Sequence, residues 1–195
     1  EEEHILDLTR RWATEGGADA QDLDPDGELT AVQNHAAGAV AGERRLVLVV
    51  GPAGTGKTTA MRPAVARLHA EGRPCFGVAP SAAAAEVLTV DTGIDADTLD
   101  KLLIEHRLNR PPRHRYDLPA GTSVIVDEAA MVPTPRLAAL IDLADRRGWR
   151  LALVGDPMQF AAVGRSGMFG HLVDTVGAVE LDRVHRFDAS WERDA

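Results

Sequence analysis

A glycine-rich segment that ends in a lysine and two threonines has the clearest chemical potential in the chain. The segment is Gly51-Pro52-Ala53-Gly54-Thr55-Gly56-Lys57-Thr58-Thr59, and it directly follows an apolar run at 46–50. Glycines let a backbone fold into a nest whose N–H groups point at phosphate oxygens. Lys57 would then reach the β- and γ-phosphates, and Thr58 would offer its hydroxyl to Mg²⁺. The segment therefore predicts a binding site for ATP and Mg²⁺.

The lysine in this segment is informative because the chain otherwise uses arginine. Of the 21 basic residues, only Lys57 and Lys101 are lysine. A compact ammonium group on a flexible stem fits beside a phosphate, where a planar guanidinium would crowd it. The alternative is a glycine-rich turn with no ligand. The order of strand, glycines, lysine, threonine and helical pattern favours the phosphate-binding loop.

Two adjacent carboxylates follow another apolar run. Asp127 and Glu128 come directly after residues 123–126, and the carboxyl ends of parallel strands are where open α/β sheets bind ligands. Asp127 is suited to holding Mg²⁺, and Glu128 to orienting and deprotonating the water that attacks the γ-phosphate. Taken alone, the pair could be two solvated acids. Beside a phosphate-binding loop, it indicates hydrolysis rather than transfer to a substrate hydroxyl.

A neutral amide is expected at the same edge. Residues 151–154 form an apolar run, and the following turn contains Gln159. Such an amide can sense the γ-phosphate, and loss of that phosphate would let the loop 161–167 relax. Gln159 is therefore the predicted sensor of the nucleotide state.

Five short apolar runs are expected to form the sheet that positions these segments. They are 46–50, 75–79, 123–126, 151–154 and 178–181. Apolar runs without alternation suit strands that are covered on both faces. Helical patterns near 57–71, 82–89, 97–106, 134–146 and 167–175 would supply the covers. The predicted class is α/β with a parallel sheet.

The N-terminal part is predicted to hold two more helices. Residues 1–15 carry apolar residues at roughly helical spacing, and 16–27 read as an acidic linker. Residues 29–41 also look helical, with Thr30 as a candidate cap. We therefore divide the chain into 1–27, a helix and linker, and 28–195, a single domain.

Composition excludes several classes of protein. The 195 residues are 45% hydrophobic, which is enough for one globular core. No apolar run is long enough for a membrane span and no signal peptide is evident, so a cytoplasmic protein is expected. Cys75 is the single cysteine, and the histidines show no paired spacing, which argues against disulfide and zinc chemistry. Most of the net charge of −9 lies in residues 1–27, so a polyanionic partner is not excluded.

Taken together, three segments carry a family resemblance. The phosphate loop, Asp127-Glu128-Ala129-Ala130-Met131-Val132 and Gly155-Asp156-Pro157-Met158-Gln159 resemble motifs I, II and III of superfamily 1 helicases of the RecD-like branch. Residues 159–164 and 181–187, together with Trp191-Glu192, most resemble the helicase region of conjugative relaxases of the TraI and TrwC type. Ala130 and Phe160 depart from the residues that are frequent in this branch, but neither would touch a phosphate or the metal.

The resemblance implies a RecA-like P-loop NTPase domain over residues 28–195. Its five parallel strands, numbered along the chain, would be ordered 5-1-4-3-2, with helices on both faces. It also implies ATP hydrolysis coupled to 5′ to 3′ movement on single-stranded DNA. The chain would be the first motor domain of a longer protein. A second RecA-like domain would supply a further arginine, so this piece alone should turn over slowly.

The resemblance also suggests roles for single residues. Gln33 matches the glutamine that reads adenine, Pro80 and Ser81 match a DNA-contacting motif, Thr98 matches a second one, and Arg186 matches an arginine that reaches the γ-phosphate. Simpler readings stand beside these roles. Gln33 could be a polar residue on an amphipathic helix, Thr98 a helix cap, and Arg186 a partner of Asp182.

A basic stretch at 106–115 is the best local site for a polyanion. It holds four arginines and no acid. The hypothesis is that Arg110, Arg113 and Arg115 contact single-stranded DNA, with an affinity that falls as salt rises. The alternative is a solvated basic loop.

Two other functions remain open from the sequence. A small P-loop kinase would need an acceptor pocket and an arginine-rich lid, which 106–115 could imitate; Glu128 beside Asp127 argues against it. A non-catalytic nucleotide-binding interaction module would bind ATP without hydrolysing it, and Glu128→Gln would then change nothing.

Overall fold

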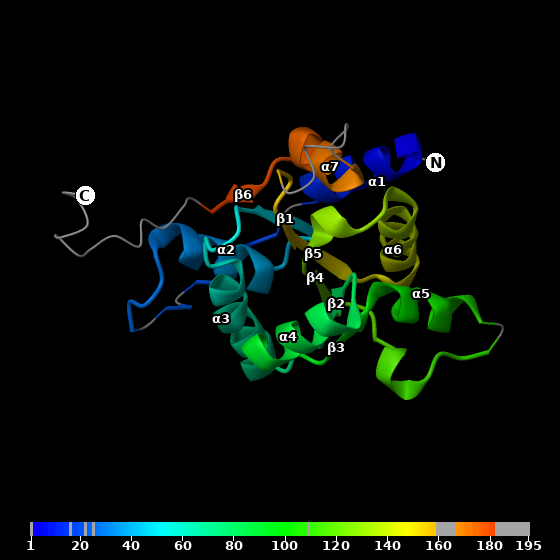
Figure 1. Ribbon diagram of the computed structural model, residues 1–195, viewed down its shortest axis with the longest axis horizontal. Coiled ribbons are helices and arrows are strands. Elements are labelled where there is room, and N and C mark those ends of the chain that lie inside the picture. Colours follow the sequence, from blue (N-terminus) through cyan, green and yellow to red (C-terminus); the bar gives the residue numbers. More distant parts are fainter. Residues whose placement is uncertain are drawn as a thin grey trace.

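A parallel sheet between two layers of helices forms the centre of the molecule (Figure 1). The computed structural model describes residues 2–15, 17–21, 23–24, 26–108, 110–158 and 167–181. Within them the sheet has six strands in the order β3-β2-β4-β5-β1-β6, and every neighbouring pair is parallel. The strands are β1 (Leu46–Val50), β2 (Cys75–Ala79), β3 (Ala96–Thr98), β4 (Ser123–Val126), β5 (Arg150–Gly155) and β6 (Val179–Glu180).

The five predicted strands are all present and in the predicted order, but the predicted count of five was wrong. The sixth strand, β3, covers three residues, the last two of which lie in the helical pattern expected near 97–106. Gly93 adopts a left-handed conformation with φ of 76° and ends the preceding helix, which lets the chain return beside β2. Gly77 then pairs with Ala96, and Ala79 with Thr98. β3 therefore adds an edge next to β2.

The helices agree with the expected patterns within a few residues. They are α1 (Glu2–Thr14), α2 (Ala31–Ala41), α3 (Lys57–Ala70), α4 (Ala82–Thr92), α5 (Leu99–Arg107), α6 (Thr134–Arg147) and α7 (Met168–Val176). Two short 3-10 turns, η1 (His114–Tyr116) and η2 (Ala129–Met131), complete the elements. None of the helices within the described ranges is long and apolar enough to cross a membrane.

Each face of the sheet has its own apolar core. On β1, Leu46, Leu48 and Val50 enter one core, while Val47 and Val49 enter the other, because successive side chains of a strand point to opposite faces. α1, α5, α6 and α7 cover the first face, and α2, α3 and α4 cover the second (Figure 1). Burial on both sides explains why the strands are continuously apolar.

The N-terminal segment is part of this packing. α1 places Ile5, Leu6, Leu8 and Trp12 in the first core, where the helix packs against α6 and α7. Between α1 and α2, the Ala20 N–H donates to the Gly38 carbonyl at 2.9 Å. α1 and Ala20 therefore lie against the sheet domain.

The strand order sets the position of the site. β5 lies between β1 and β4, so the loop after β1, the turn after β4 and the turn after β5 meet at one edge. This is the carboxyl edge, where open α/β sheets bind their ligands.

Candidate active site

The predicted phosphate-binding loop connects β1 to α3 as a compact turn. Gly54 and Gly56 have φ of 81° and 83°, a left-handed conformation that glycine adopts without steric penalty. The Thr55 side chain turns inward, and its Oγ1 donates to the Pro52 carbonyl at 2.9 Å. Gly56 directly precedes α3, so the loop leads into a helix N-terminus whose free N–H groups favour an anion.

The first glycine of the loop is required by close packing. A Cβ on Gly51 would lie 2.5 Å from Thr55 Oγ1 and 2.9 Å from Leu181 Cβ. The Gly51 N–H donates to the Gly155 carbonyl at 3.1 Å, which extends the β1–β5 pairing by one step. The start of the loop is therefore fixed to the sheet.

Lys57 lies inside the curve of the loop. Its Nζ donates to the Gly51 carbonyl at 2.6 Å and to the Pro52 carbonyl at 3.0 Å. Thr58 and Thr59 follow in the first turn of α3. The ammonium group is thus held within the loop, and its contact with a phosphate stays a prediction.

The acid pair lies at the end of β4 in a tight turn. The Asp127 N–H donates to the Val78 carbonyl at 2.9 Å, and the Glu128 N–H donates to Asp127 Oδ1 at 2.9 Å. Among the residues that the structure describes, Glu128 is the only non-glycine with positive φ, at 51°. A left-handed conformation costs an L-residue roughly 1–2 kcal/mol. Such strain persists where the surrounding structure imposes it, and it clusters at functional sites.

The Asp127 carboxyl has a raised pKa. Burial raises its pKa above the ordinary value, and the charge of Glu128 adds to this. The Glu128 N–H and the charge of Lys57 act in the opposite direction. A divalent cation would supply further positive charge beside this half-buried carboxylate. Oxygen donors such as Asp127 and the Thr58 hydroxyl are the ligands that Mg²⁺ prefers, so the residues present fit this metal.

We expect Asp127→Asn to raise the melting temperature in metal-free buffer at pH 8, because it removes a charge that burial disfavours. A gain of about 1 kcal/mol in the free energy of unfolding would raise the melting temperature by about 2–4 °C. Because the pKa is raised in the folded state, the folded protein holds more protons than the unfolded one, and stability falls as pH rises through that pKa. The gain should vanish below about pH 3.9, where the unfolded carboxyl is also protonated.

Thermal unfolding across pH measures this effect. Asp174→Asn on the exposed face of α7 is the matched control and should leave the melting temperature unchanged. Added Mg²⁺ should stabilise the wild-type protein more than the Asp127 variant. An Asp127→Asn protein with a lower melting temperature at pH 8 would contradict the argument.

Gln33 supports the loop, a role that sequence reasoning missed. Its side chain is only 7% exposed. Nε2 donates to the Thr55 carbonyl at 3.2 Å, and Oε1 accepts the Thr30 N–H at 3.0 Å. Thr30 Oγ1 accepts the Gln33 N–H in return, which completes a capping box for α2. The Thr30-x-x-Gln33 spacing is the signal that could have shown the capping role. The adenine-reading role of Gln33 stays a prediction.

The third segment is described only at its beginning. Asp156 is buried, and its Oδ1 accepts the Met158 N–H at 2.9 Å. Gln159 and Arg186 lie outside the described residues. Their assignment to the γ-phosphate therefore remains a prediction.

The residues predicted to contact DNA from β2 and β3 lie at the carboxyl edge. Pro80 and Ser81 follow β2, and Ser81 caps α4 by accepting the Ala84 N–H at 3.1 Å. Thr98 ends β3 and caps α5 by accepting the Lys101 N–H at 3.3 Å. The cap reading of Thr98 is thus confirmed, and the DNA contacts stay predictions.

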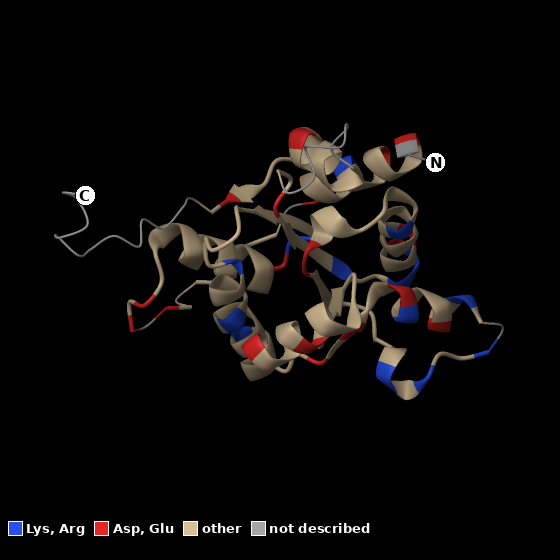
Figure 2. Ribbon diagram, viewed as in Figure 1, with Lys and Arg blue, Asp and Glu red and all other residues tan. Residues whose placement is uncertain are grey.

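Arg110, Arg113 and Arg115 of the basic stretch are exposed but make ion pairs. Glu105 on α5 is only 4% exposed. Its carboxylate accepts from Arg110 Nη2 at 3.0 Å and from the Arg113 N–H at 3.1 Å, and it pairs with Arg113 Nε at 3.4 Å. The basic residues that follow α5 are visible in Figure 2. The absence of acids within 106–115 was misleading, because neighbouring elements supply them.

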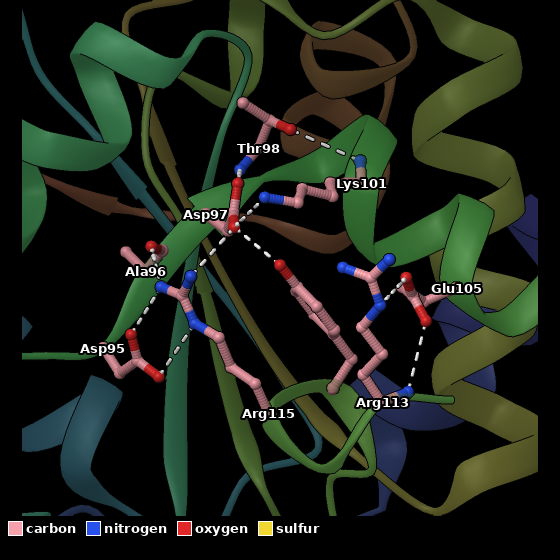
Figure 3. A network of polar contacts seen from close by, with 9 residues as sticks. Asp95, Ala96, Asp97, Thr98, Lys101, Glu105, Arg113 and Arg115 are labelled. Atoms are coloured by element: carbon pink, nitrogen blue, oxygen red, sulfur yellow. Dashed lines mark hydrogen bonds and ion pairs between the residues drawn. The ribbon is translucent and has the colours of Figure 1, made fainter. Parts of the chain in front are cut away.

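Arg115 is held against β3 (Figure 3). Its guanidinium pairs with Asp95 at 2.6 Å and Asp97 at 3.1 Å, and it donates to the Ala96 carbonyl at 2.7 Å. Asp97 also accepts from the Tyr116 hydroxyl at 2.7 Å and pairs with Lys101 at 3.1 Å. Arg115 therefore fastens the end of the basic stretch to the sheet edge.

The fold and the site define a class of protein. A parallel sheet carries a glycine-rich loop with Lys57 after β1, and Asp127 and Glu128 after β4, with one strand between them. This is the arrangement of a P-loop NTPase with a RecA-like sheet. Residues 28–195 match the AAA domain family, so the chain belongs to that family.

Relatives support this membership. The chain is 36% identical over 169 residues to the conjugal transfer protein TraA of Agrobacterium fabrum, a match that covers 87% of this chain and 15% of TraA. It is 33% identical over 194 residues to the RecBCD enzyme subunit RecD of Mycolicibacterium smegmatis, covering 81% of this chain and 33% of RecD. The chain thus spans a minor part of both relatives. The predicted likeness to RecD-like helicase domains of superfamily 1 is confirmed.

Solved structures share the fold. A Pif1 helicase studied at forked double-stranded DNA superposes with a TM-score of 0.51 at 21% identity, covering 87% of this chain and 47% of that one. The UvsW helicase of bacteriophage T4 gives 0.53 at 10% identity, with 88% and 65% covered. At these identities the likeness concerns the fold alone.

Proposed function

We propose that the chain is the ATP-hydrolysing first motor domain of a helicase or translocase that acts on single-stranded DNA, within a conjugative relaxase-helicase. The carrying observation is that β5 holds the Lys57 loop on one side and the Asp127–Glu128 turn on the other, at a single sheet edge. TraA is named for conjugal transfer and RecD for the RecBCD enzyme, which supports the choice of DNA as the partner.

Binding of ATP would exchange the partners of Lys57. Its Nζ would leave the Gly51 and Pro52 carbonyls, which it now contacts, for the β- and γ-phosphate oxygens, because hydrogen bonds to charged acceptors are the stronger ones. The loop N–H groups and the start of α3 would hold the same phosphates. Gln33 would keep the loop in place through Thr55 or read adenine.

Hydrolysis would use the acid turn. Thr58 and Asp127 would hold Mg²⁺, which neutralises charge that builds up on the phosphates. Glu128 would orient the attacking water and accept its proton. Gln159 would report whether the γ-phosphate is present, and Arg186 and a second RecA-like domain would complete the site. Closure of that second domain on the same ATP would produce movement.

DNA would lie along the same edge, farther from the nucleotide. Pro80 and Ser81 after β2 and Thr98 after β3 occupy the strand ends beyond β4. In this arrangement, a change at the γ-phosphate has a short path through β4 and β2 to the nucleic acid. Arg110 and Arg113, positioned by Glu105 beyond the end of α5, would add positive charge for the nucleic acid.

We expect Glu105→Gln to weaken the binding of single-stranded DNA by about fivefold, although it removes a negative charge. Two arginines depend on this carboxylate for their positions, and a fixed phosphate contact is lost when its cation becomes mobile. Glu86→Gln, at an exposed position on α4, removes the same charge and should leave affinity unchanged or slightly higher.

Fluorescence anisotropy with labelled oligonucleotides over a salt series measures both variants, with melting temperature as the check on folding. If Glu105→Gln tightened binding as much as the control did, ordered arginines would not be the source of affinity. Unchanged affinity and an unchanged salt slope would remove this stretch from the DNA site.

The proposed function is tested by phosphate release from ATP with and without single-stranded DNA, in the intact protein. DNA-stimulated release supports the motor, and a preference for ATP over GTP supports adenine reading. A kinase would ignore the polymer and require a small acceptor. Nucleotide binding without hydrolysis, with or without DNA, would favour a non-catalytic nucleotide-binding interaction module.

A further inference from the structure

Gly155, the last residue of β5, lies between the two halves of the proposed active site. Toward β1 it is paired with Val50, and its carbonyl accepts the N–H of Gly51 at 3.1 Å. β4, which ends one residue before Asp127, lies on the other side of β5. Gly155 is therefore a shared neighbour of the phosphate loop and the acid turn.

The acid turn packs directly on the Cα of Gly155. A Cβ at this position would lie 3.0 Å from the Ala130 nitrogen, 3.3 Å from the Ala129 nitrogen and 3.2 Å from Phe169 Cε1. Two of these atoms are backbone and cannot rotate away. The φ of Gly155 is not positive, so the backbone conformation does not demand glycine. The requirement at this position is for space.

Displacement of Ala129 would act on Glu128 directly. Glu128 is one residue earlier and is held in its left-handed conformation by local bonds. Its N–H donates to Asp127 Oδ1 at 2.9 Å, and its carbonyl accepts the Met131 N–H at 2.8 Å. A strained conformation persists only while its surroundings impose it. A shift of a few tenths of an ångström in η2 would therefore move the Glu128 carboxylate.

We propose that Gly155 is a positioning residue for ATP hydrolysis, which sets the distance between the Glu128 carboxylate and the phosphate loop. Its bare Cα determines how closely the acid turn approaches β5, and its carbonyl fixes the start of the loop. This inference rests on the proposed function. It assigns to Gly155 a part in the chemical step rather than in nucleotide affinity. A methyl group on Gly155 would meet the acid turn and Phe169, not the phosphate loop, so the loop would keep its shape.

Gly77 provides a matched control within the same sheet. It lies in β2, and a Cβ there would approach Ala96 Cβ at 2.7 Å, Leu88 Cδ2 at 2.8 Å and Ile94 Cγ2 at 3.1 Å. The crowding is at least as severe as at Gly155, but all three contacts are side chains of the core away from the acid turn. Gly77→Ala therefore reproduces overpacking without disturbing Glu128.

The test compares Gly155→Ala with Gly77→Ala in the intact protein, with DNA-stimulated ATP hydrolysis, the Kd of a nonhydrolysable ATP analogue and the melting temperature as readouts. We expect Gly155→Ala to lower kcat about 10-fold with Kd within about twofold of wild type, because small misplacement of a reacting group is costly. Gly77→Ala should lower the melting temperature and leave kcat per folded molecule unchanged.

A double-substitution cycle tests whether Gly155 acts through Glu128. In a Glu128→Gln background, Gly155→Ala should give no further loss of kcat, because the group that it displaces is already inactive. If Gly155→Ala alone does not fold, Gly155→Ala with Phe169→Leu removes the ring contact and keeps the methyl group against the turn. We expect this double variant to have a kcat about 10-fold lower than that of Phe169→Leu alone, with a similar Kd.

Wild-type kcat in Gly155→Ala would overturn the inference, as would a raised Kd with unchanged kcat or an additive loss in the Glu128→Gln background. A wild-type protein that binds ATP and hydrolyses none would instead overturn the proposed function. The two failures are therefore distinguishable by the activity of the wild-type protein.

Discussion

Lys57→Ala is expected to reduce kcat/KM for ATP by about 10³-fold, the effect of removing a preorganised donor from a transition state that accumulates negative charge. The Lys57 ammonium lies 2.6 Å from the Gly51 carbonyl within the curve of the loop, so its removal takes a side-chain cation from the centre of the proposed phosphate site. Phosphate release measures the loss of hydrolysis, and binding of a nonhydrolysable analogue measures the loss of nucleotide affinity.

Lys101→Ala is the matched control for this change, because Lys101 is the only other lysine of the chain. It pairs with Asp97 at 3.1 Å beside β3, and its loss should leave hydrolysis within about twofold of wild type, as for an exposed ion pair. Lys57→Arg should be nearly as inactive as Lys57→Ala, since a planar guanidinium does not fit the loop. Substantial hydrolysis by Lys57→Ala would contradict the assignment of the phosphate site.

Glu128→Gln is expected to lower kcat by about 10²–10⁴-fold, the contribution of a general base, while nucleotide binding persists. The amide is nearly isosteric and leaves the Glu128 N–H bond to Asp127 in place, so the left-handed turn should survive. Single-turnover phosphate release measures the chemical step, and analogue binding shows that the site remains intact.

The control for Glu128→Gln is Asp127→Asn, the neighbouring acid. It should weaken Mg²⁺-dependent nucleotide binding as well as hydrolysis, whereas Glu128→Gln should affect hydrolysis alone. Equal losses of binding in both variants would show that the two acids share one role. Unchanged hydrolysis in Glu128→Gln would favour a non-catalytic nucleotide-binding module.

The fold was predictable where the sequence shows a clear pattern of apolar residues. Apolar runs without alternation indicated strands covered on both faces, and the two cores of β1 confirm this. β3 was missed because three residues are too short to show a period. Its place is decided by the turn at Gly93 and by pairing with β2, which a sequence pattern does not display.

The candidate site was predictable to the extent that its residues are neighbours in the chain. The phosphate loop and the Asp127–Glu128 pair are continuous segments, so their chemistry is visible in the sequence. The ion pairs of the basic stretch are not visible in this way, because the stretch itself folds back onto Glu105 in α5 and onto Asp95 just before β3. The close contact of Gly155 with η2 is likewise not visible in the sequence, because it brings together residues that follow two different strands.

The pairing of β1 has a consequence for synthesis on the ribosome. β1 carries the phosphate loop, yet its neighbours are β5 and β6, and Leu46 pairs with Leu151. When only the first half of this domain has emerged, this hydrophobic segment has open edges on both sides, a condition that promotes aggregation. Nascent chains that stall before residue 150 should therefore need chaperone protection, and the domain should acquire protease resistance only late in translation.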